Sequence, residues 1–299
     1  MDTQEKKILV VTHSGRFHAD EVMAVAALEL FFAGRPYEVV RSRDPKMWGQ
    51  GNYVVDVGGE FDPVRGRFDH HQAGGAGTRP DGTPYSSFGA VWKFLGTKIC
   101  NGSAEVSDRI ERKLGYPIDM ADNGIEVYKT IYPGIHPYIL HQFVGALNST
   151  WKEGDKQTER FVETVSIFKR LLEREILVTA HELEGAAIVR KLYENSADKR
   201  LIVMDDQYPN EVLSEFPEPL FVVKPARQTG NWEVECVRND AHGFENRKSL
   251  PKEWGGKFAE ELAVQTGVPD AVFCHRACFL AVAGSKDGAI ALAKIALLA

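Results

Sequence analysis

A short apolar run followed at once by a longer helix-like run, near the start of the chain, constrains the fold more than any other feature. The run KILVVTH is β-branched and predicts a buried strand, and ADEVMAVAALELFF after it has helical periodicity and strong helix formers. Two further runs, YEVVRSR and NYVVDVGG, predict strands. Because strands that alternate with helices form mostly parallel sheets, we expect an α/β fold with helices flanking such a sheet. Ligands of these sheets gather at the carboxyl ends of the strands.

The remainder of the chain predicts a long connecting helix and a second, smaller α/β unit. The pattern is helical from Ser87 to about Trp151, and a segment rich in Glu, Lys, Arg and Leu from about Gln157 to Tyr193 predicts one long helix. The runs KRLIVMDD, LFVVKPAR and NWEVECVR then predict strands, and GKFAEELAVQ and KDGAIALAKIALLA predict helices. We therefore expect a first domain at 1–196, which includes the long helix, and a C-terminal domain at 197–299. Gly and Pro in residues 73–87 predict a mobile loop.

The composition favours a globular protein of the cytoplasm. Of the 299 residues 43% are hydrophobic, enough for one large or two medium cores, and no apolar run is long enough to span a bilayer. The first residues, MDTQEKK, are polar and lead straight into a strand, so we expect no signal or transit peptide. Four cysteines lack paired zinc-binding spacing, which suits a reducing cytosol and predicts packing thiols: Cys100, Cys236, Cys274 and Cys278.

The net charge limits how the chain could bind nucleic acid. A formal charge of -6 argues against nonspecific coating of a nucleic acid. A local basic groove is still compatible with that total. We therefore expect any nucleic acid to be held at an end or in a cleft.

Residues that commonly bind metals recur where the predicted strands end. His13 ends the first strand, and His18 and Asp20 lie at the strand-to-helix turn that follows. Two later strands end in Asp56 and in the run Asp69, His70 and His71. Asp122, in IDMADNG, is a later carboxylate that a helical connection could return to this edge. The set offers imidazole and carboxylate groups without thiolate, which suits Mn²⁺, Mg²⁺, Fe²⁺ or Zn²⁺ more than a structural zinc. The sequence therefore predicts a divalent-metal site at one edge of the sheet.

Four of these segments together resemble a known set of metal motifs. THSGRFHADE, VVDVGG, FDHHQ and MADNG, in this order, resemble the motifs of the DHH phosphoesterase superfamily, and in detail those of its MYG branch, the melanocyte-proliferating-gene proteins. SSFGAVW, NRKSLPKEW and AVFCHRACF resemble later segments of that branch, so the similarity covers nearly the whole chain. The resemblance implies a DHH-like fold and a pair of divalent ions that cleave phosphate esters or anhydrides. It also implies an exonuclease that trims RNA from its 3′ end.

The resemblance implies a role for each ligand-type residue. One ion would be held by His13, His18 and Asp56, and the other by Asp20, Asp56, His70 and Asp122, with Asp56 bridging the two. Many superfamily members carry Asp where this chain has His18, which makes the first site less negative here. Asp69 would orient a His. Because neighbours on an extended backbone point to opposite sides, we expect one of His70 and His71 to bind metal and the other to contact the substrate. The resemblance implies that His70 binds metal and that His71 contacts the scissile phosphate or donates a proton.

Other residues could hold the substrate. Arg247 and Lys248 are either substrate contacts or an exposed solvated pair, and His275 is either a buried structural residue or, as the resemblance implies, a phosphate contact. Ser285 and Lys286 offer donors at the start of the last helix, a favourable place for an anion. This region is poorer in consecutive glycines than the MYG branch usually is.

Some polar residues have a simpler structural explanation. Ser87 is expected to be a helix N-cap rather than a phosphate contact. His136 and His141, on a helical stretch, are expected to be packing or surface residues. A Ser or Cys nucleophile is not needed, because two divalent ions can share a water, lower its pKa and stabilise the attacking and departing oxygens.

Three classes of function remain open. The leading one is a metal-dependent phosphodiesterase, a hydrolase with two divalent cations, Mn²⁺ expected, acting on RNA or short oligonucleotides. The second is a hydrolase of small phosphoanhydrides or dinucleotides, and the third is a non-catalytic metal-binding regulator. We expect no membrane partner, and the sequence leaves open whether the chain forms a homodimer.

Overall fold

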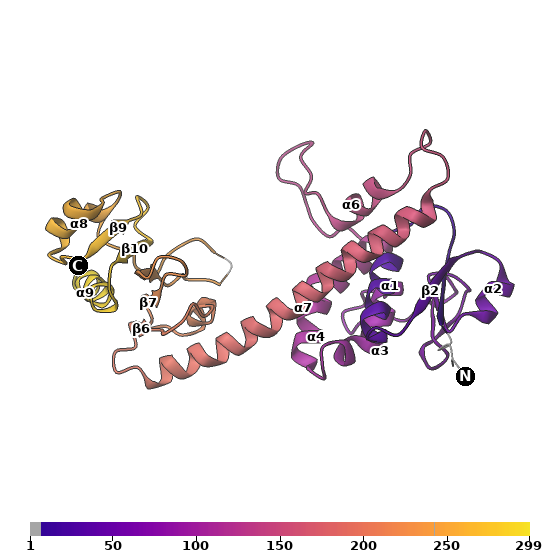
Figure 1. Cartoon of the computed structure of the whole chain (residues 1–299), viewed down its shortest axis with the longest axis horizontal. Coiled ribbons are helices and arrows are strands. Elements are labelled where there is room, and N and C mark those ends of the chain that lie inside the picture. The colour runs from indigo at the N-terminus through magenta and orange to yellow at the C-terminus, as the bar shows by residue number, and fades with distance from the viewer. Residues whose placement is uncertain (1–6, 242) are drawn as a thin grey trace, which may run out of the picture. The chain divides into compact units, whose positions relative to one another are not determined.

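The chain divides into two compact units, which are described separately. The structure, a computed structural model, describes residues 7–241 and 243–299 (Figure 1). The first unit runs to Ala180 and the second begins at His181. This division falls inside the 39-residue helix α7, Gln157–Asn195, whereas the boundary expected at residue 197 follows the end of that helix. The expectation about a targeting peptide concerns mainly residues 1–6, which lie outside the described residues.

The first unit contains the mostly parallel sheet that the sequence predicts. Its strand order is β2-β1-β3-β5-β4, in which β1, β2, β3 and β5 run parallel and β4 pairs antiparallel with β5. The strands are β1 Ile8–Thr12, β2 Tyr37–Arg41, β3 Tyr53–Val55, β4 Phe61–Asp62 and β5 Arg67–Phe68. This confirms the expected α/β fold.

The helix α1, Ala19–Phe32, forms the centre of the first unit. Its residues from Ala19 to Leu28 are buried on every side, which matches a sequence that is apolar almost all round. The helix packs against α3, Ser87–Ile99 (Figure 1). The other helices of this unit are α2 Pro45–Gln50, α4 Ala104–Ile110, α5 Tyr116–Asp122 and α6 Leu140–Leu147, with a π-helical turn at Glu111–Gly115 and a 3₁₀ turn at Pro63–Arg65.

A buried aspartate joins α3, α5 and the segment expected to be a mobile loop. Asp119 on α5 accepts hydrogen bonds from the backbone of Gly89 at 3.0 Å, from the Ser86 hydroxyl at 2.5 Å and from Arg79 at 2.7 Å. Arg79 itself is buried, and its Nε also donates to Glu111 at 2.8 Å. Because Arg79 lies within residues 73–87, this loop is anchored at its centre, which the Gly and Pro content did not indicate.

The second unit has a mixed sheet. Its strand order is β6-β7-β8-β10-β9, where only β6 and β7 run parallel and the other pairs are antiparallel. The elements are β6 Leu201–Val203, β7 Phe221–Pro225, β8 Trp232–Cys236, β9 Ala271–Cys274, β10 Leu280–Ala283, α8 Ala259–Thr266 and α9 Lys286–Leu298, with 3₁₀ turns at Glu211–Glu215 and Lys252–Trp254. All elements expected from the sequence of this unit are present.

The cysteines are packing residues, as expected. All four are free and buried. Burial raises the pKa of Cys100 to about 11 and those of Cys236 and Cys274 to about 12. These thiols therefore stay protonated near neutral pH and are poor nucleophiles.

No helix in the described part of the chain is both long and apolar enough to cross a membrane.

Candidate metal centre

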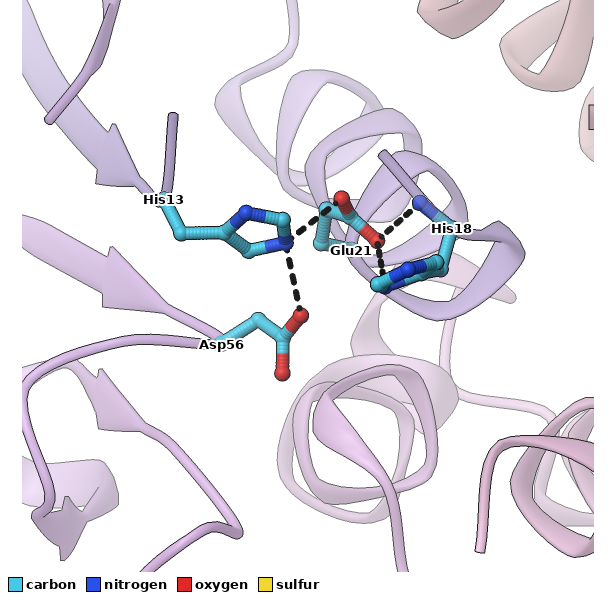
Figure 2. Close-up of side chains that lie close together, drawn as sticks. All are labelled: His13, His18, Glu21 and Asp56. Atoms are coloured by element: carbon cyan, nitrogen blue, oxygen red, sulfur yellow. Dashed lines mark hydrogen bonds and ion pairs between the residues drawn. The ribbon is translucent and has the colours of Figure 1, made fainter. Parts of the chain in front are cut away.

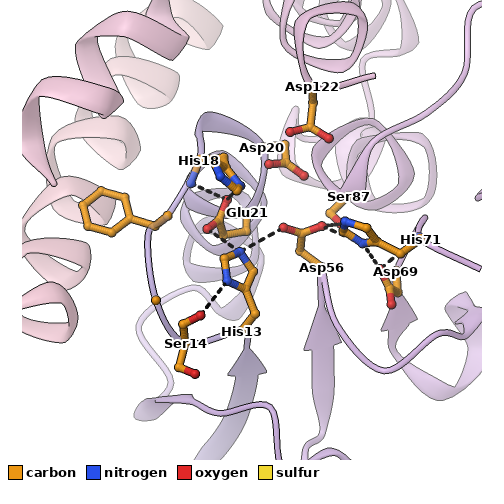
Figure 3. Close-up of polar contacts among 12 residues, drawn as sticks. His13, Ser14, His18, Asp20, Glu21, Asp56, Asp69, His71, Ser87 and Asp122 are labelled. Atoms are coloured by element: carbon orange, nitrogen blue, oxygen red, sulfur yellow. Dashed lines mark hydrogen bonds and ion pairs between the residues drawn. The ribbon is translucent and has the colours of Figure 1, made fainter. Parts of the chain in front are cut away.

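Polar side chains from three parallel strands meet the first turn of α1 at one edge of the first sheet. His13 follows β1 directly, Asp56 follows β3, and Asp69 follows β5. Figure 3 shows His13 and Asp56 at the tips of neighbouring strands, with Glu21 on the helix that faces them. The parallel sheet thus brings together residues that are far apart in sequence, at the edge where ligands of such folds bind.

The first group of ligand-type side chains contains His13, His18, Glu21 and Asp56 (Figure 2). Nε2 of His13 lies 2.9 Å from Oε1 of Glu21 and 3.3 Å from Oδ2 of Asp56. One ligand atom from each of the four residues lies within 4.8 Å of the others. The structure therefore brings together the three residues expected at the first ion, and adds a carboxylate that the sequence interpretation missed.

The second group surrounds His70. Its Nε2 lies 3.2 Å from Oδ1 of Asp56, 3.2 Å from Oδ2 of Asp122 and 3.9 Å from Oδ2 of Asp20. Asp56 therefore faces His13 with one carboxylate oxygen and His70 with the other. This is the position expected of a bridging ligand.

The backbone of Asp56 has an uncommon conformation. Its φ is +57°, in the left-handed region that residues with a Cβ rarely adopt. The Ser87 hydroxyl donates a hydrogen bond to Oδ1 of Asp56 at 3.1 Å, which holds the carboxylate. The N-cap of α3 is Ser86, so the expectation that Ser87 is the N-cap was wrong: Ser87 supports the site.

The carboxylates of the two groups change the pKa values of the imidazoles. Burial alone lowers the pKa of His13, but hydrogen bonds with Asp56 and Glu21 raise it to about 10. Burial likewise lowers the pKa of His70, and its contacts with Asp122 and Asp56 raise it to about 10. Without a metal ion, both imidazoles are therefore protonated near neutral pH, and their positive charges neutralise part of the negative charge of the carboxylates.

The carboxylates respond in opposite directions. Burial raises the pKa of Asp20 well above its usual value, and the charges of Asp56, Asp122 and Glu21 raise it further. Burial also acts to raise the pKa values of Asp56 and Asp122, but their histidine neighbours hold both below the ordinary value.

Several buried ligand atoms make no hydrogen bond of regular geometry among the described residues. They are both carboxylate oxygens of Asp20, and also Oε1 of Glu21 and Nε2 of His70, whose only close partners are the other ligand-type groups of the site. Buried polar atoms without partners are costly, and a divalent cation would satisfy these. The donors are imidazole and carboxylate, a set that suits such a cation. The residues therefore fit the metal ions that the sequence predicts.

Two residues of the site were missed by the sequence interpretation. Glu21 lies three residues after His18, a spacing that places two side chains on the same face of a helix, so a signal was present. His141, expected to be a packing or surface residue, has its Nε2 buried and 3.8 Å from Oδ1 of Asp122. Only the folded path of the chain brings His141 and Asp122 together.

Asp69 holds the exposed histidine of the adjacent pair. Nδ1 of His71 lies 2.8 Å from Oδ1 of Asp69, which also accepts the backbone N–H groups of His70 and His71 at 2.8 and 3.2 Å. The other oxygen accepts from the backbone of Gly59 at 2.5 Å. The side chain of His71 is 63% exposed and that of His70 only 8%.

The two histidines do not alternate as neighbours in a strand would. Strand β5 ends at Phe68, and the imidazole rings of His70 and His71 lie with centroids 4.4 Å apart. The two side chains therefore do not point to opposite sides of a strand. They differ in burial instead: the buried His70 is the candidate metal ligand, and the exposed His71 is the candidate substrate contact.

The residues expected to hold the substrate all lie in the second unit, where each has contacts of its own. Arg247 donates to the backbone carbonyls of Ser214 at 2.6 Å, Pro219 at 3.3 Å and Phe216. Lys248 donates to the carbonyl of Leu297 at 3.1 Å, near the end of α9. These bonds stabilise the second unit, and a role of either side chain in substrate binding stays a prediction.

The other three candidates lie beside β9 and α9. His275 follows β9 and accepts a hydrogen bond from the backbone of Ala277 at 3.1 Å. Ser285 is the N-cap of α9, and its hydroxyl donates to Asp270 at 2.5 Å. The ammonium of Lys286 lies 5.2 Å from the centre of the Trp232 ring. Contact of these residues with a substrate also stays a prediction.

The fold and the site together define a class of protein: an α/β, phosphoesterase-like chain with a candidate divalent-metal centre at the carboxyl edge of its parallel sheet. The chain belongs to the MYG1_exonuc family, described as an uncharacterised protein family (UPF0160), whose profile matches residues 9–297. This confirms the resemblance to the MYG branch.

Proteins of known name resemble the chain over almost its full length. The MYG1 exonuclease of Homo sapiens is 29% identical, with 96% of this chain and 85% of that protein covered. The MYG1 protein of Dictyostelium discoideum is 30% identical, with 96% and 95% covered. A solved structure, CDC45 from Entamoeba histolytica, aligns with a TM-score of 0.28 and 11% identity over 97% of this chain and 95% of that one, which is too low to establish a shared fold.

Proposed function

We propose that this chain is a divalent-metal-dependent phosphodiesterase, an exonuclease that trims RNA or short oligonucleotides from the 3′ end. The observation that carries the proposal is the position of Asp56, whose two oxygens lie 3.3 Å from Nε2 of His13 and 3.2 Å from Nε2 of His70. One carboxylate between two ligand groups is the arrangement that a pair of ions requires. The relatives named MYG1 exonuclease support the reaction class.

The two ions would share Asp56 and have separate ligands otherwise. One would be held by His13, His18, Asp56 and Glu21. The other would be held by Asp20, Asp56, His70 and Asp122. Two divalent ions supply an activated water near neutral pH and stabilise the attacking and departing oxygens. We propose Mn²⁺ as the physiological ion, with Mg²⁺ as the alternative.

The chain itself supplies a proton donor. Because Nδ1 of His71 is held by Asp69, Nε2 is the nitrogen that remains for the substrate. The imidazolium would stabilise the negative charge that develops at the phosphate and protonate the departing oxygen. Asp69 orients His71, and the exposure of His71 leaves it accessible to a phosphodiester.

A groove at the C-terminal end of α5, the helix that carries Asp122, supports a substrate of several nucleotides. It has a volume of about 670 Å³ and is lined by residues that include Ala121, Ile125, Tyr128, Lys129 and His136. An aromatic ring and cationic or hydrogen-bonding side chains along a groove suit the bases and phosphates of a single strand.

The second unit would add to substrate binding through Arg247, Lys248, His275, Ser285 and Lys286. We further propose a cytoplasmic location, which the four free cysteines support.

An assay with purified protein tests the function. The protein is incubated with Mn²⁺ and, separately, with RNA and DNA labelled at the 5′ or 3′ end, a dinucleotide and pyrophosphate, and the Asp56→Asn variant serves as the inactive control. The expected result is stepwise shortening of 5′-labelled RNA and early release of the 3′ label. Hydrolysis of pyrophosphate or the dinucleotide alone would identify a small-molecule hydrolase. No hydrolysis of any substrate would favour a metal-binding regulator.

A further inference from the structure

Two arginines at the end of β2 lie next to the first ligand group. Strand β2 pairs in parallel with β1, so its carboxyl end reaches the same edge of the sheet as His13. Nη2 of Arg41 donates to the carbonyl of Gly15 at 2.8 Å, and Nε of Arg43 donates to the carbonyl of Ser14 at 3.3 Å. Both arginines therefore contact the turn that follows β1.

Arg41 fixes this turn from within the protein. Its guanidinium carbon lies 4.8 Å from the centre of the Phe161 ring and 5.5 Å from that of Phe17. Its Nε and Nη1 are buried without a hydrogen-bond partner among the described residues. Arg41 is thus a support for the turn, because its guanidinium is enclosed by aromatic rings.

Arg43 is exposed and has a different environment. Its Nη2 lies 3.3 Å from Nδ1 of His13, and Nδ1 also lies 3.1 Å from the carbonyl of Ser14. These contacts place the guanidinium of Arg43 at the edge of the first ligand group, beside His13.

Arg43 has no carboxylate partner in the part of the chain that the structure describes, which leaves its guanidinium available to an anion. None of the ion pairs between described residues involves it. Asp44, the neighbour of Arg43, uses Oδ1 to accept from the backbone of Lys46 at 2.9 Å as the N-cap of α2. A guanidinium matches the oxygens of a phosphate group in geometry and charge.

We propose that Arg43 forms a phosphate-binding subsite at the edge of the first ligand group and binds a non-bridging oxygen of a substrate phosphate. This inference rests on the proposed function, because it assigns a phosphate-containing substrate to the same site. It places a substrate-binding arginine in the first unit, in addition to the residues expected from the second.

The test compares Arg43→Gln with Arg43→Lys and with the control Arg35→Gln. Arg35 is an exposed arginine that precedes β2, at the opposite edge of the same sheet, so its substitution makes the same change in charge. Each full-length variant is loaded with Mn²⁺, titrated with inorganic phosphate by calorimetry, and assayed with single-stranded RNA at several salt concentrations. Mn²⁺ affinity is measured separately.

Arg43→Gln is expected to weaken phosphate binding and raise KM for RNA by about tenfold, the scale of one hydrogen bond to a charged group. The slope of log KM against log salt should fall by about 0.7, the contribution of one phosphate contact on a single strand. The values of kcat and of Mn²⁺ affinity should stay within about twofold of wild type, Arg43→Lys should recover part of the loss, and Arg35→Gln should behave as wild type.

The proposal is overturned if Arg43→Gln and Arg35→Gln have the same KM and phosphate affinity. It is also overturned if Arg43→Gln lowers Mn²⁺ affinity and leaves phosphate binding intact, because Arg43 then acts on His13. If the wild-type protein does not hydrolyse RNA, the proposed function fails, while the phosphate titration still decides whether the subsite exists.

Discussion

His13 and Glu21 form the closest contact between side chains of the first ligand group, with Nε2 of the imidazole 2.9 Å from Oε1 of the carboxylate and both side chains buried. Glu21 also accepts the backbone N–H of His18 at 2.8 Å through its other oxygen. Glu21 and Asp56 are the two carboxylates of the first group, so Glu21 adds negative charge that His13, His18 and Asp56 alone would not supply.

The variant Glu21→Gln is expected to weaken the first ion position while it preserves the fold. The amide keeps an oxygen for the N–H of His18, so the start of α1 should stay intact, but the charge is lost. Mn²⁺ affinity at one of two positions should fall by about 10- to 100-fold, the usual effect of losing a group that supports a metal ligand. Metal analysis after gel filtration measures the loss, and Glu29→Gln on the same helix is the control. Two equally tight Mn²⁺ ions in Glu21→Gln would contradict this role.

Metal binding is expected to release protons. In the metal-free protein burial lowers the pKa values of His13 and His70, but their carboxylate partners raise both to about 10. Because a ligating imidazole must be neutral, an ion displaces one proton from each, and Mn²⁺ affinity should rise with pH up to about 10. Calorimetry at pH 7.5 in two buffers of different ionisation enthalpy measures the number of protons released. A heat of binding that is independent of the buffer would exclude this coupling.

The same groups make the stability of the metal-free protein depend on pH. Their folded pKa values, about 10, lie above the ordinary value of 6.5, so protonation stabilises the folded state. This contribution is complete below pH 6.5 and is lost as the pH rises through 10. Urea unfolding in EDTA should therefore give a lower free energy of unfolding at pH 9 than at pH 6. A His13→Gln variant should show a smaller decrease, and an equal decrease would assign the effect to other groups.

The sequence predicts the parts of the site that depend on local pattern. The run ADEVMAVAALELFF coincides with α1, and the strand ends place His13 and Asp56 at one edge because parallel strands share their direction. The contact between His141 and Asp122 depends on the path of residues between α5 and α6, which no periodicity encodes. In the second unit the pattern identifies strands but not their direction, so the mostly antiparallel pairing could not be derived from it.

Gly89 is expected to be essential for the packing of α3 against α5. A methyl group at this position would overlap the carboxylate of Asp119, which is fixed by Ser86 and Arg79. Gly89→Ala should lower the free energy of unfolding by about 1–3 kcal/mol, as overpacking of a core does. In Gly145→Ala, on α6, the added methyl group has no atom within 4 Å, and this control should be neutral or slightly stabilising. Thermal or urea unfolding of both variants measures the difference. Equal stabilities would mean that Asp119 can move.

The adjacent histidines are expected to have separate roles, which their burial and partners indicate. His70 is buried among Asp20, Asp56 and Asp122, so His70→Ala should lose Mn²⁺ affinity. His71 is exposed and held by Asp69, so His71→Ala should keep the metal but lower kcat by about 10², the scale of one lost acid–base group. Mn²⁺ titration beside initial rates measures both quantities on each variant. Loss of metal in His71→Ala and its retention in His70→Ala would reverse the roles. If neither change affects the rate, this edge of the sheet is not where the reaction occurs, since the proposed proton donor and the central ligand of the second group would both be dispensable.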